Sequence, residues 1–129
     1  MDREFAGLSP AAKREKMFQS WRAPPGVGFI SSEAEKAYQE RVTRIIDAIQ
    51  LKVPDRVPVI PSIGFFPAHY ARMTIQEAMY DVDKACRAWE KYTFDFAPDA
   101  HSGPYAGGRV YDIIDYKLYA WPGHGTSPD

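Results

Sequence analysis

The fold is decided by residues 52–102, which read KVPDRVPVIPSIGFFPAHYARMTIQEAMYDVDKACRAWEKYTFDFAPDAHS. The apolar run VPVIP at 57–61 predicts a short strand, because Gly64 and Pro67 interrupt the chain soon after it. Thr74 and Glu77 have the spacing of a capping box, so a helix is expected from Ile75. The segment DFAPDAH at 95–101 predicts a second strand that leads into a loop. A strand, a helix and a strand in this order are typical of a right-handed parallel unit.

The expected helix between the two strands has a single apolar stripe. Its members recur at spacings of three and four, which places them on one helical face: Ile75, Ala78, Met79, Val82, Ala85, Cys86 and Trp89. We therefore expect Cys86 to be a buried structural thiol and not a nucleophile. Loops at the carboxyl ends of parallel strands usually hold the chemistry, which directs attention to residues 62–70 and 101–108.

The bulk composition excludes several classes of protein. The chain has 129 residues, of which 45% are hydrophobic, enough for one modest domain with a core. Sixteen basic and 17 acidic residues give a net charge of −1, which argues against a nucleic-acid partner. No apolar run approaches the ~20 residues of a membrane span, so we expect no membrane association. The single cysteine excludes an internal disulfide framework and is typical of a cytoplasmic protein.

Helices are expected on the N-terminal side of the first strand. Ser9 and Pro10 are typical of a helix start, and this helix should reach about residue 21. A linker, APPGVG at 23–28, precedes a second capping box that begins at Ser32, and that helix should reach about residue 51. We therefore divide the chain into an N-terminal helical extension, 1–51, and a β/α part, 52–129. In the latter, residues 107–114 are expected to form a short helix or turn, and 116–121 a third extended piece.

The two loops contain the candidate site residues. The first holds Phe66, His69, Tyr70 and Arg72, and a histidine with a pKa near ~6.5 can carry protons at neutral pH. The alternative is that the aromatic residues cover the end of the sheet and that the histidine is an ordinary exposed side chain.

Asp99 lies in the second expected strand, and His101 and Tyr105 follow it in the second loop. If the strand continues to this point, Asp99 and His101 lie at its carboxyl end, and we expect the strand-end cavity to be faced by a residue of this pair. The alternative is a turn with ordinary polar residues. No metal-ligand spacing can be built around Cys86.

Four short stretches resemble the uroporphyrinogen decarboxylase superfamily: KVPDRVPV at 52–59, MTIQEA at 73–78, FDFAPD at 94–99 and YAWPGHG at 119–125. The resemblance covers about residues 35–125 and implies an α/β fold, a TIM (β/α)8 barrel preceded by N-terminal helices. Such a barrel needs ~250 residues, so the chain would supply only its N-terminal part, about two to three strands. The rest would come from a C-terminal segment, a partner chain or self-association, as expected of a truncated or split gene product.

The resemblance implies two chemistries. The decarboxylases carry an arginine-rich motif after the first strand, whereas the matching residues 62–67 here read SIGFFP and contain no arginine. The chain is therefore more similar to the corrinoid-dependent methyltransferase branch, in which His and Cys of later strands hold zinc. Zinc, a corrinoid and a corrinoid protein are implied for the complete enzyme. This segment alone is expected to bind no cofactor.

The resemblance also implies roles for the candidate residues. His69 and His101 would be the catalytic residues, as proton carriers, and the substrate-binding residues would be Phe66, Tyr70, Arg72, Asp99 and Tyr105. Two other functions stay open at this point. One is a decarboxylase of porphyrin biosynthesis with a divergent loop, in which Arg72 and Arg109 would bind carboxylates. The other is a non-catalytic half-barrel that pairs with a partner through an exposed apolar sheet edge.

Overall fold

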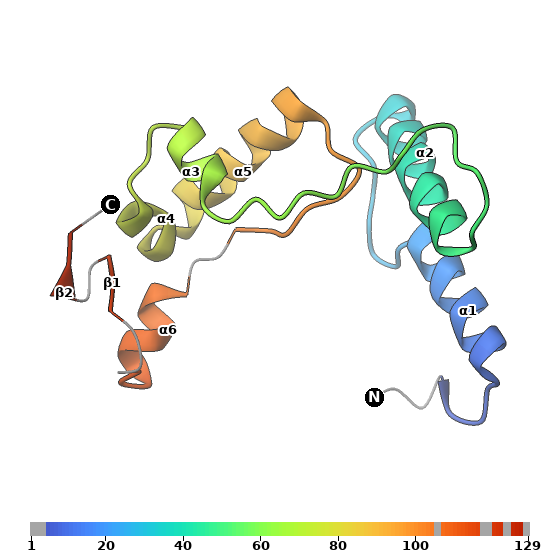
Figure 1. The fold of residues 1–129 in the computed structure, drawn as a ribbon, viewed down its shortest axis with the longest axis horizontal. Coiled ribbons are helices and arrows are strands. Elements are labelled where there is room, and N and C mark those ends of the chain that lie inside the picture. Colours follow the sequence, from blue (N-terminus) through green and yellow to red (C-terminus); the bar gives the residue numbers. More distant parts are fainter. Residues whose placement is uncertain (1–4, 105–106, 117–119, 123–124, 128–129) are drawn as a thin grey trace. The chain divides into compact units, whose positions relative to one another are not determined.

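The computed structural model describes residues 5–104, 107–116, 120–122 and 125–127. Within these residues the chain is mostly helical, with six helices and two strands of two residues each (Figure 1). The chain divides into two compact units, Met1–Val59 and Ile60–Asp129. Residues 52–59 thus belong with the N-terminal helices in the first unit.

Two helices form the first unit. Helix α1, Pro10–Arg22, begins as expected: the Ser9 hydroxyl accepts from the amide of Ala12, and proline occupies the first helical position. Helix α2, Ser32–Ile49, begins one residue earlier than expected, because its capping residue is Ser31 and not Ser32. The two helices are joined by side-chain contacts, among them a hydrogen bond of 2.6 Å from the Tyr38 hydroxyl to the carbonyl oxygen of Trp21.

The expected first strand does not form. Residues 57–61 belong to no helix or strand. Two prolines in five residues remove ladder donors, and the described part of the chain provides no adjacent strand. The apolar side chains of this segment face solvent: Val57 is 80% exposed and Ile60 is 55% exposed.

Three helices form most of the second unit: α3, Phe66–Tyr70; α4, Ile75–Tyr80; and α5, Val82–Phe96. The capping box is confirmed, because the Thr74 hydroxyl accepts from the amide of Glu77 and the Glu77 carboxylate accepts from the amide of Thr74. The single helix expected after it is wrong. Asp81 has an extended backbone, with φ −116° and ψ 93°, and its carboxylate caps α5 by accepting from the amide of Lys84.

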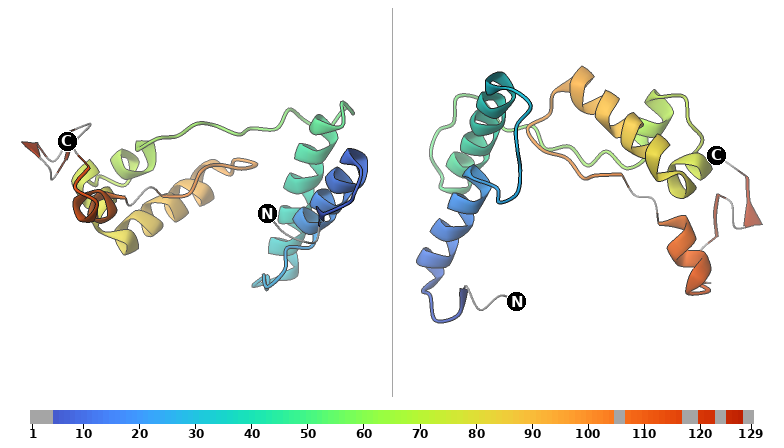
Figure 2. Two further views of the ribbon diagram at one scale, coloured as in Figure 1. Left: turned by 90° about the horizontal axis from the view of Figure 1, so that it is seen from below. Right: turned by 180° about the vertical axis from the view of Figure 1, so that it is seen from behind.

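The core of the second unit lies where α3 and α4 contact α5. The three helices lie side by side in both further views of the molecule (Figure 2). The buried residues of this core are Ile63, Ala68, Ala78, Ala88, Trp89 and Tyr92. The expected burial of Cys86 is wrong: its thiol is exposed, as is Val82. The buried stripe of α5 keeps Ala85 and Trp89 of the expected stripe, but Ala88 and Tyr92 complete it in place of Val82 and Cys86.

The expected second strand is also absent. Residues 95 and 96 complete the last turn of α5, and Ala97 ends the helix in the left-handed region at φ 44°. The chain from there to residue 104 is irregular. No parallel strand–helix–strand unit is therefore present in the described residues.

A short helix and a small strand pair follow. Helix α6, Gly108–Ile113, confirms the short helix, and Gly108 lies so close to Tyr80 that an added Cβ would meet the tyrosine ring at 2.7 Å. Strand β1, Trp121–Pro122, pairs in parallel with β2, Gly125–Thr126. The expected extended piece at 116–121 reaches β1 only at its last residue, and its positions 117–119 lie outside the described residues.

The observed fold class is therefore helix-rich, and no barrel is formed by the described residues. In the ranges that the structure describes, no helix combines the length and the apolar character that crossing a bilayer requires.

Candidate functional site

Four aromatic rings from α3 and α5 form one cluster, which we call the aromatic cluster: Phe66, Tyr70, Tyr92 and Phe96. Within each helix the two rings are nearly parallel, with centroids 5.9 Å apart for Phe66 and Tyr70 and 5.1 Å apart for Tyr92 and Phe96. Between the helices the rings meet edge to face at 5.1 to 5.9 Å. Each such pair stabilises by about 0.5–1.5 kcal/mol beyond its buried area, so the cluster fixes α3 against α5.

Charged groups border the cluster at Tyr70. The Tyr70 hydroxyl donates to the Asp95 carboxylate over 2.8 Å, and Lys91 pairs with the same carboxylate. The Lys91 ammonium lies 4.7 Å from the centroid of the Tyr70 ring, in cation–π contact. The hydrogen bond from Lys91 lowers the pKa of Asp95, and the hydrogen bond to Asp95 raises the pKa of Lys91. Both groups are therefore charged at neutral pH.

His101 lies beside the cluster and is engaged at both ring nitrogens. Nδ1 lies 2.7 Å from the carbonyl oxygen of Ser102, and Nε2 lies 2.8 Å from the Thr93 hydroxyl. Because a carbonyl oxygen only accepts, Nδ1 carries the proton of that bond. The imidazole meets the Tyr92 ring edge to face at 5.5 Å. The Ser102 carbonyl also accepts from Trp89 Nε1, so His101 helps to tie residues 101–102 to α5.

The cluster leaves aromatic surface open to solvent. Phe66 is 46% exposed and Phe96 is 51% exposed, whereas Tyr92 beneath them is buried. The exposed ring faces can bind a flat or apolar group by stacking. The Tyr70–Asp95–Lys91 group beside them can orient that ligand by hydrogen bonds.

The predicted site residues are only partly brought together. Phe66 and Tyr70 are members of the cluster, and His101 contacts it through Tyr92. His69 is exposed on α3, and its side chain makes no hydrogen bond or ring contact to another described residue.

The other predicted substrate-binding residues do not join the cluster. Arg72 is exposed in the turn after α3, with φ 58°, and Asp99 is buried in a bend after α5. Tyr105 lies outside the described residues. Arg109, the other predicted carboxylate ligand, is in the first turn of α6 and borders a hollow together with Asp81 and Asp83.

Sequence reasoning missed the half of the site that α5 supplies. Tyr92 and Phe96 are four residues apart, as are Lys91 and Asp95, and both spacings place the partners side by side on a helix. These spacings could have identified a helix, and not a strand, at residues 95 and 96.

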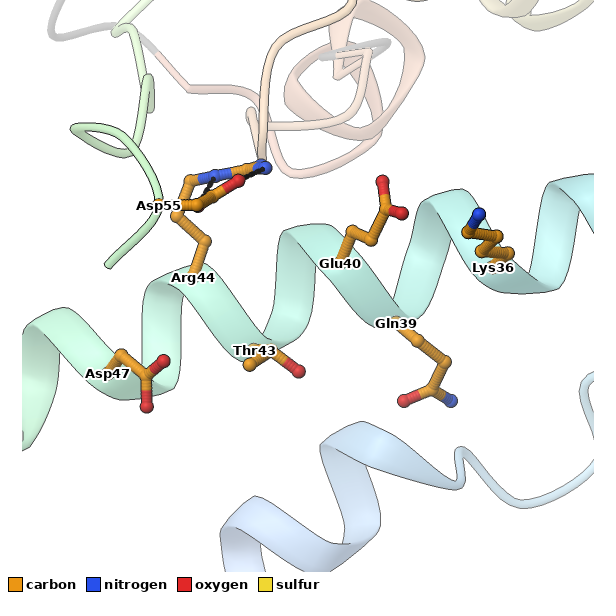
Figure 3. Close-up of a pocket in the computed structure, with 7 residues that line it drawn as sticks. All are labelled: Lys36, Gln39, Glu40, Thr43, Arg44, Asp47 and Asp55. Atoms are coloured by element: carbon orange, nitrogen blue, oxygen red, sulfur yellow. Dashed lines mark hydrogen bonds and ion pairs between the residues drawn. The ribbon is translucent and has the colours of Figure 1, made fainter. Parts of the chain in front are cut away.

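The first unit has a hollow of about 340 Å³ along α2 (Figure 3). Its main feature is a two-bonded ion pair: Arg44 Nε donates to Asp55 Oδ1 over 2.7 Å, and Nη2 donates to Oδ2 over 2.6 Å. The hydrogen bond from Arg44 lowers the pKa of Asp55 to about 2. Figure 3 shows Gln39 and Thr43 on another side of the helix from this pair. This hollow is a poor site for an anion, because acidic and basic side chains both line it and because its arginine is already bonded to a carboxylate.

The residues present do not fit zinc. Within 5–104, 107–116, 120–122 and 125–127, no three His, Cys, Asp or Glu side chains are placed so that they could hold a metal ion. Comparison with protein-family models, with curated proteins and with solved structures finds no match.

Proposed function

We propose that this chain supplies the N-terminal portion of an enzyme of the uroporphyrinogen decarboxylase superfamily, on the methyltransferase-like side. In this proposal residues 57–61 become the first strand of a barrel when further polypeptide adds a neighbouring strand. The aromatic cluster then forms part of the wall on the substrate side.

One observation carries the proposal: an apolar segment, residues 57–61, follows the N-terminal helices with exposed side chains and belongs to no helix or strand. Val57 and Ile60 are 80% and 55% exposed. Complete burial of a fully exposed side chain of this kind stabilises by about 1.5–3 kcal/mol, so the exposed fractions of Val57 and Ile60 leave about 2–4 kcal/mol together for association. Strands of parallel barrels read as short apolar runs of this kind, because both of their faces are covered.

The roles of this chain's residues follow from their positions. The exposed rings of Phe66 and Phe96 would contact the apolar part of a substrate. The Tyr70–Asp95–Lys91 group would orient a polar part. His69, exposed and without side-chain partners in the described part of the chain, is the histidine that can exchange a proton without breaking an existing bond. Zinc in this branch would activate a methyl acceptor. No set of side chains in the described residues fits zinc, so no step that needs zinc is assigned to this chain.

The proposal is tested by mixing the full chain with a polypeptide that supplies the later strands of a methyltransferase-type member. We expect a stable one-to-one complex in light scattering and slower amide hydrogen exchange at residues 57–61. Val57→Lys should weaken the complex. Ile30→Lys is the matched control, because Ile30 is 95% exposed and lies outside residues 57–61.

Several outcomes would contradict the proposal. A chain that stays monomeric in the mixture, with unchanged exchange at 57–61, would overturn it. A complex that decarboxylates a porphyrinogen, with loss of activity in Arg72→Gln, would favour the decarboxylase. Assembly of the chain with itself, without any activity, would favour the non-catalytic half-barrel.

A further inference from the structure

The second unit contains a hollow whose charged lining is entirely cationic. It has a volume of about 270 Å³ and is lined by six residues of the α3–α4 turn and of α5: Ala71, Met73, Lys84, Arg87, Ala88 and Lys91. The hollow along α2 and the hollow beside Arg109 differ from it, because acidic and basic side chains line each of them.

The two lysines are held in place by carboxylates that do not line the hollow. Lys84 Nζ lies 2.8 Å from Glu77 Oε1 and 3.8 Å from Asp81 Oδ2. Lys91 is held by Asp95 and by the face of the Tyr70 ring. These contacts reduce the freedom of both ammonium groups, so less conformational entropy remains to be lost when a ligand binds.

Arg87 is the uncommitted cation of the set. It follows Lys84 by three residues and precedes Lys91 by four, so the three side chains share one face of α5. Its guanidinium makes no ion pair or hydrogen bond within the part of the chain that the structure describes. A guanidinium offers a planar pair of donors that matches the oxygens of a phosphate or carboxylate.

The remaining lining is apolar. Met73 and the methyl groups of Ala71 and Ala88 form it. A ligand with a small apolar body would therefore gain contact area here that a bare ion would not.

We propose that this hollow binds a small organic oxyanion, with Arg87 as the principal ligand of the anionic group, Lys84 and Lys91 as flanking cations, and Met73 against the apolar body. The site shares Lys91 with the charged border of the aromatic cluster, whereas its other lining residues lie outside that cluster, and it does not depend on the proposed barrel. Phosphate monoesters and carboxylates share the required chemistry.

The test is a titration of the full chain with phenyl phosphate and with inorganic phosphate at low ionic strength, followed by amide chemical shifts. We expect saturable shifts confined to residues 71–73 and 84–91, and tighter binding of phenyl phosphate than of inorganic phosphate. Arg87→Gln should weaken binding about tenfold or more, because it removes a charge-assisted bidentate contact. Substitution by Gln keeps the helix propensity, so the variant should fold normally.

Arg14→Gln is the matched control, because it removes the same charge from an exposed position on α1. Equal weakening by the two variants would show non-specific attraction and would overturn the site. Shifts located elsewhere, no saturation, or equal affinity for the two phosphates would also overturn it. A dicarboxylate titrated in the same way distinguishes the two ligand classes: tighter binding than phenyl phosphate assigns a carboxylate, and weaker binding assigns a phosphate.

Discussion

His69→Ala and His101→Ala should differ sharply in their effect on stability, although sequence reasoning gave both histidines the same catalytic role. The His101 imidazole makes hydrogen bonds of 2.7 and 2.8 Å and an edge-to-face contact with Tyr92. Each hydrogen bond contributes about 0.5–1.5 kcal/mol and the ring contact a similar amount. The His101 side chain is partly exposed, so the summed contribution of these contacts should be at the low end of their range. Its partners have other bonds available: Trp89 Nε1 still donates to the Ser102 carbonyl, and the Thr93 hydroxyl can donate to the Trp89 carbonyl.

We therefore expect His101→Ala to lower the free energy of unfolding by about 1–2 kcal/mol. His69→Ala should change it by less than about 0.5 kcal/mol, because the side chain is exposed and Ala is the better helix former. The assay is urea unfolding of the full chain at neutral pH, followed by far-ultraviolet circular dichroism. Equal costs for the two variants, or a neutral His101→Ala, would refute the placement of His101 as the residue that ties the loop to α5.

Three further outcomes follow from local contacts. Ser31→Ala should destabilise α2 by about 1 kcal/mol in the same unfolding assay, whereas Ser32→Ala should be near neutral, because only the Ser31 hydroxyl accepts the capping bond. The hydrogen bond from Arg44 lowers the pKa of Asp55 from 3.8 to about 2. The contribution of this ion pair to stability is therefore present above about pH 4 and is lost as the pH falls to about 2. Asp55→Asn should remove this part of the acid dependence when unfolding is measured across the same pH range. Cys86 should react with a maleimide in the absence of denaturant at a rate close to that in urea, and strong protection would contradict its exposure.

The sequence correctly predicted features that depend on neighbours along the chain. The Ser9–Pro10 helix start and the capping box at Thr74 each need only three or four consecutive residues, and both are present. The strands expected at 57–61 and 95–101 were wrong, since a strand also needs a partner that local patterning cannot supply. The same local reasoning read residues 95 and 96 as a strand although the Lys91 and Asp95 spacing is helical.

The break at Asp81 explains the error at Cys86. An uninterrupted helix from Ile75 would carry Val82 and Cys86 on the same face as Ile75 and Met79. Asp81 instead adopts an extended conformation and begins a new helix, and the new helix takes its own orientation. Its buried face includes Ala88 and Tyr92 in addition to Ala85 and Trp89, and this rotation of the buried face leaves Cys86 exposed. Aspartate is favoured at the start of a helix because its carboxylate can accept a hydrogen bond from the first turn. Apolar periodicity alone does not contain this signal.

The two prolines in residues 57–61 limit how much backbone pairing can contribute if this segment joins a sheet. Alternate residues of a strand direct their backbone groups to opposite edges, so Pro58 and Pro61 remove one donor from each edge. A neighbouring strand would lack a ladder bond, worth about 0.5–1.5 kcal/mol, whichever edge it approached. Burial of the exposed fractions of Val57 and Ile60, at about 2–4 kcal/mol for the two together, exceeds that loss. Side-chain burial, and not backbone pairing, would therefore supply most of the free energy with which this segment joins a barrel.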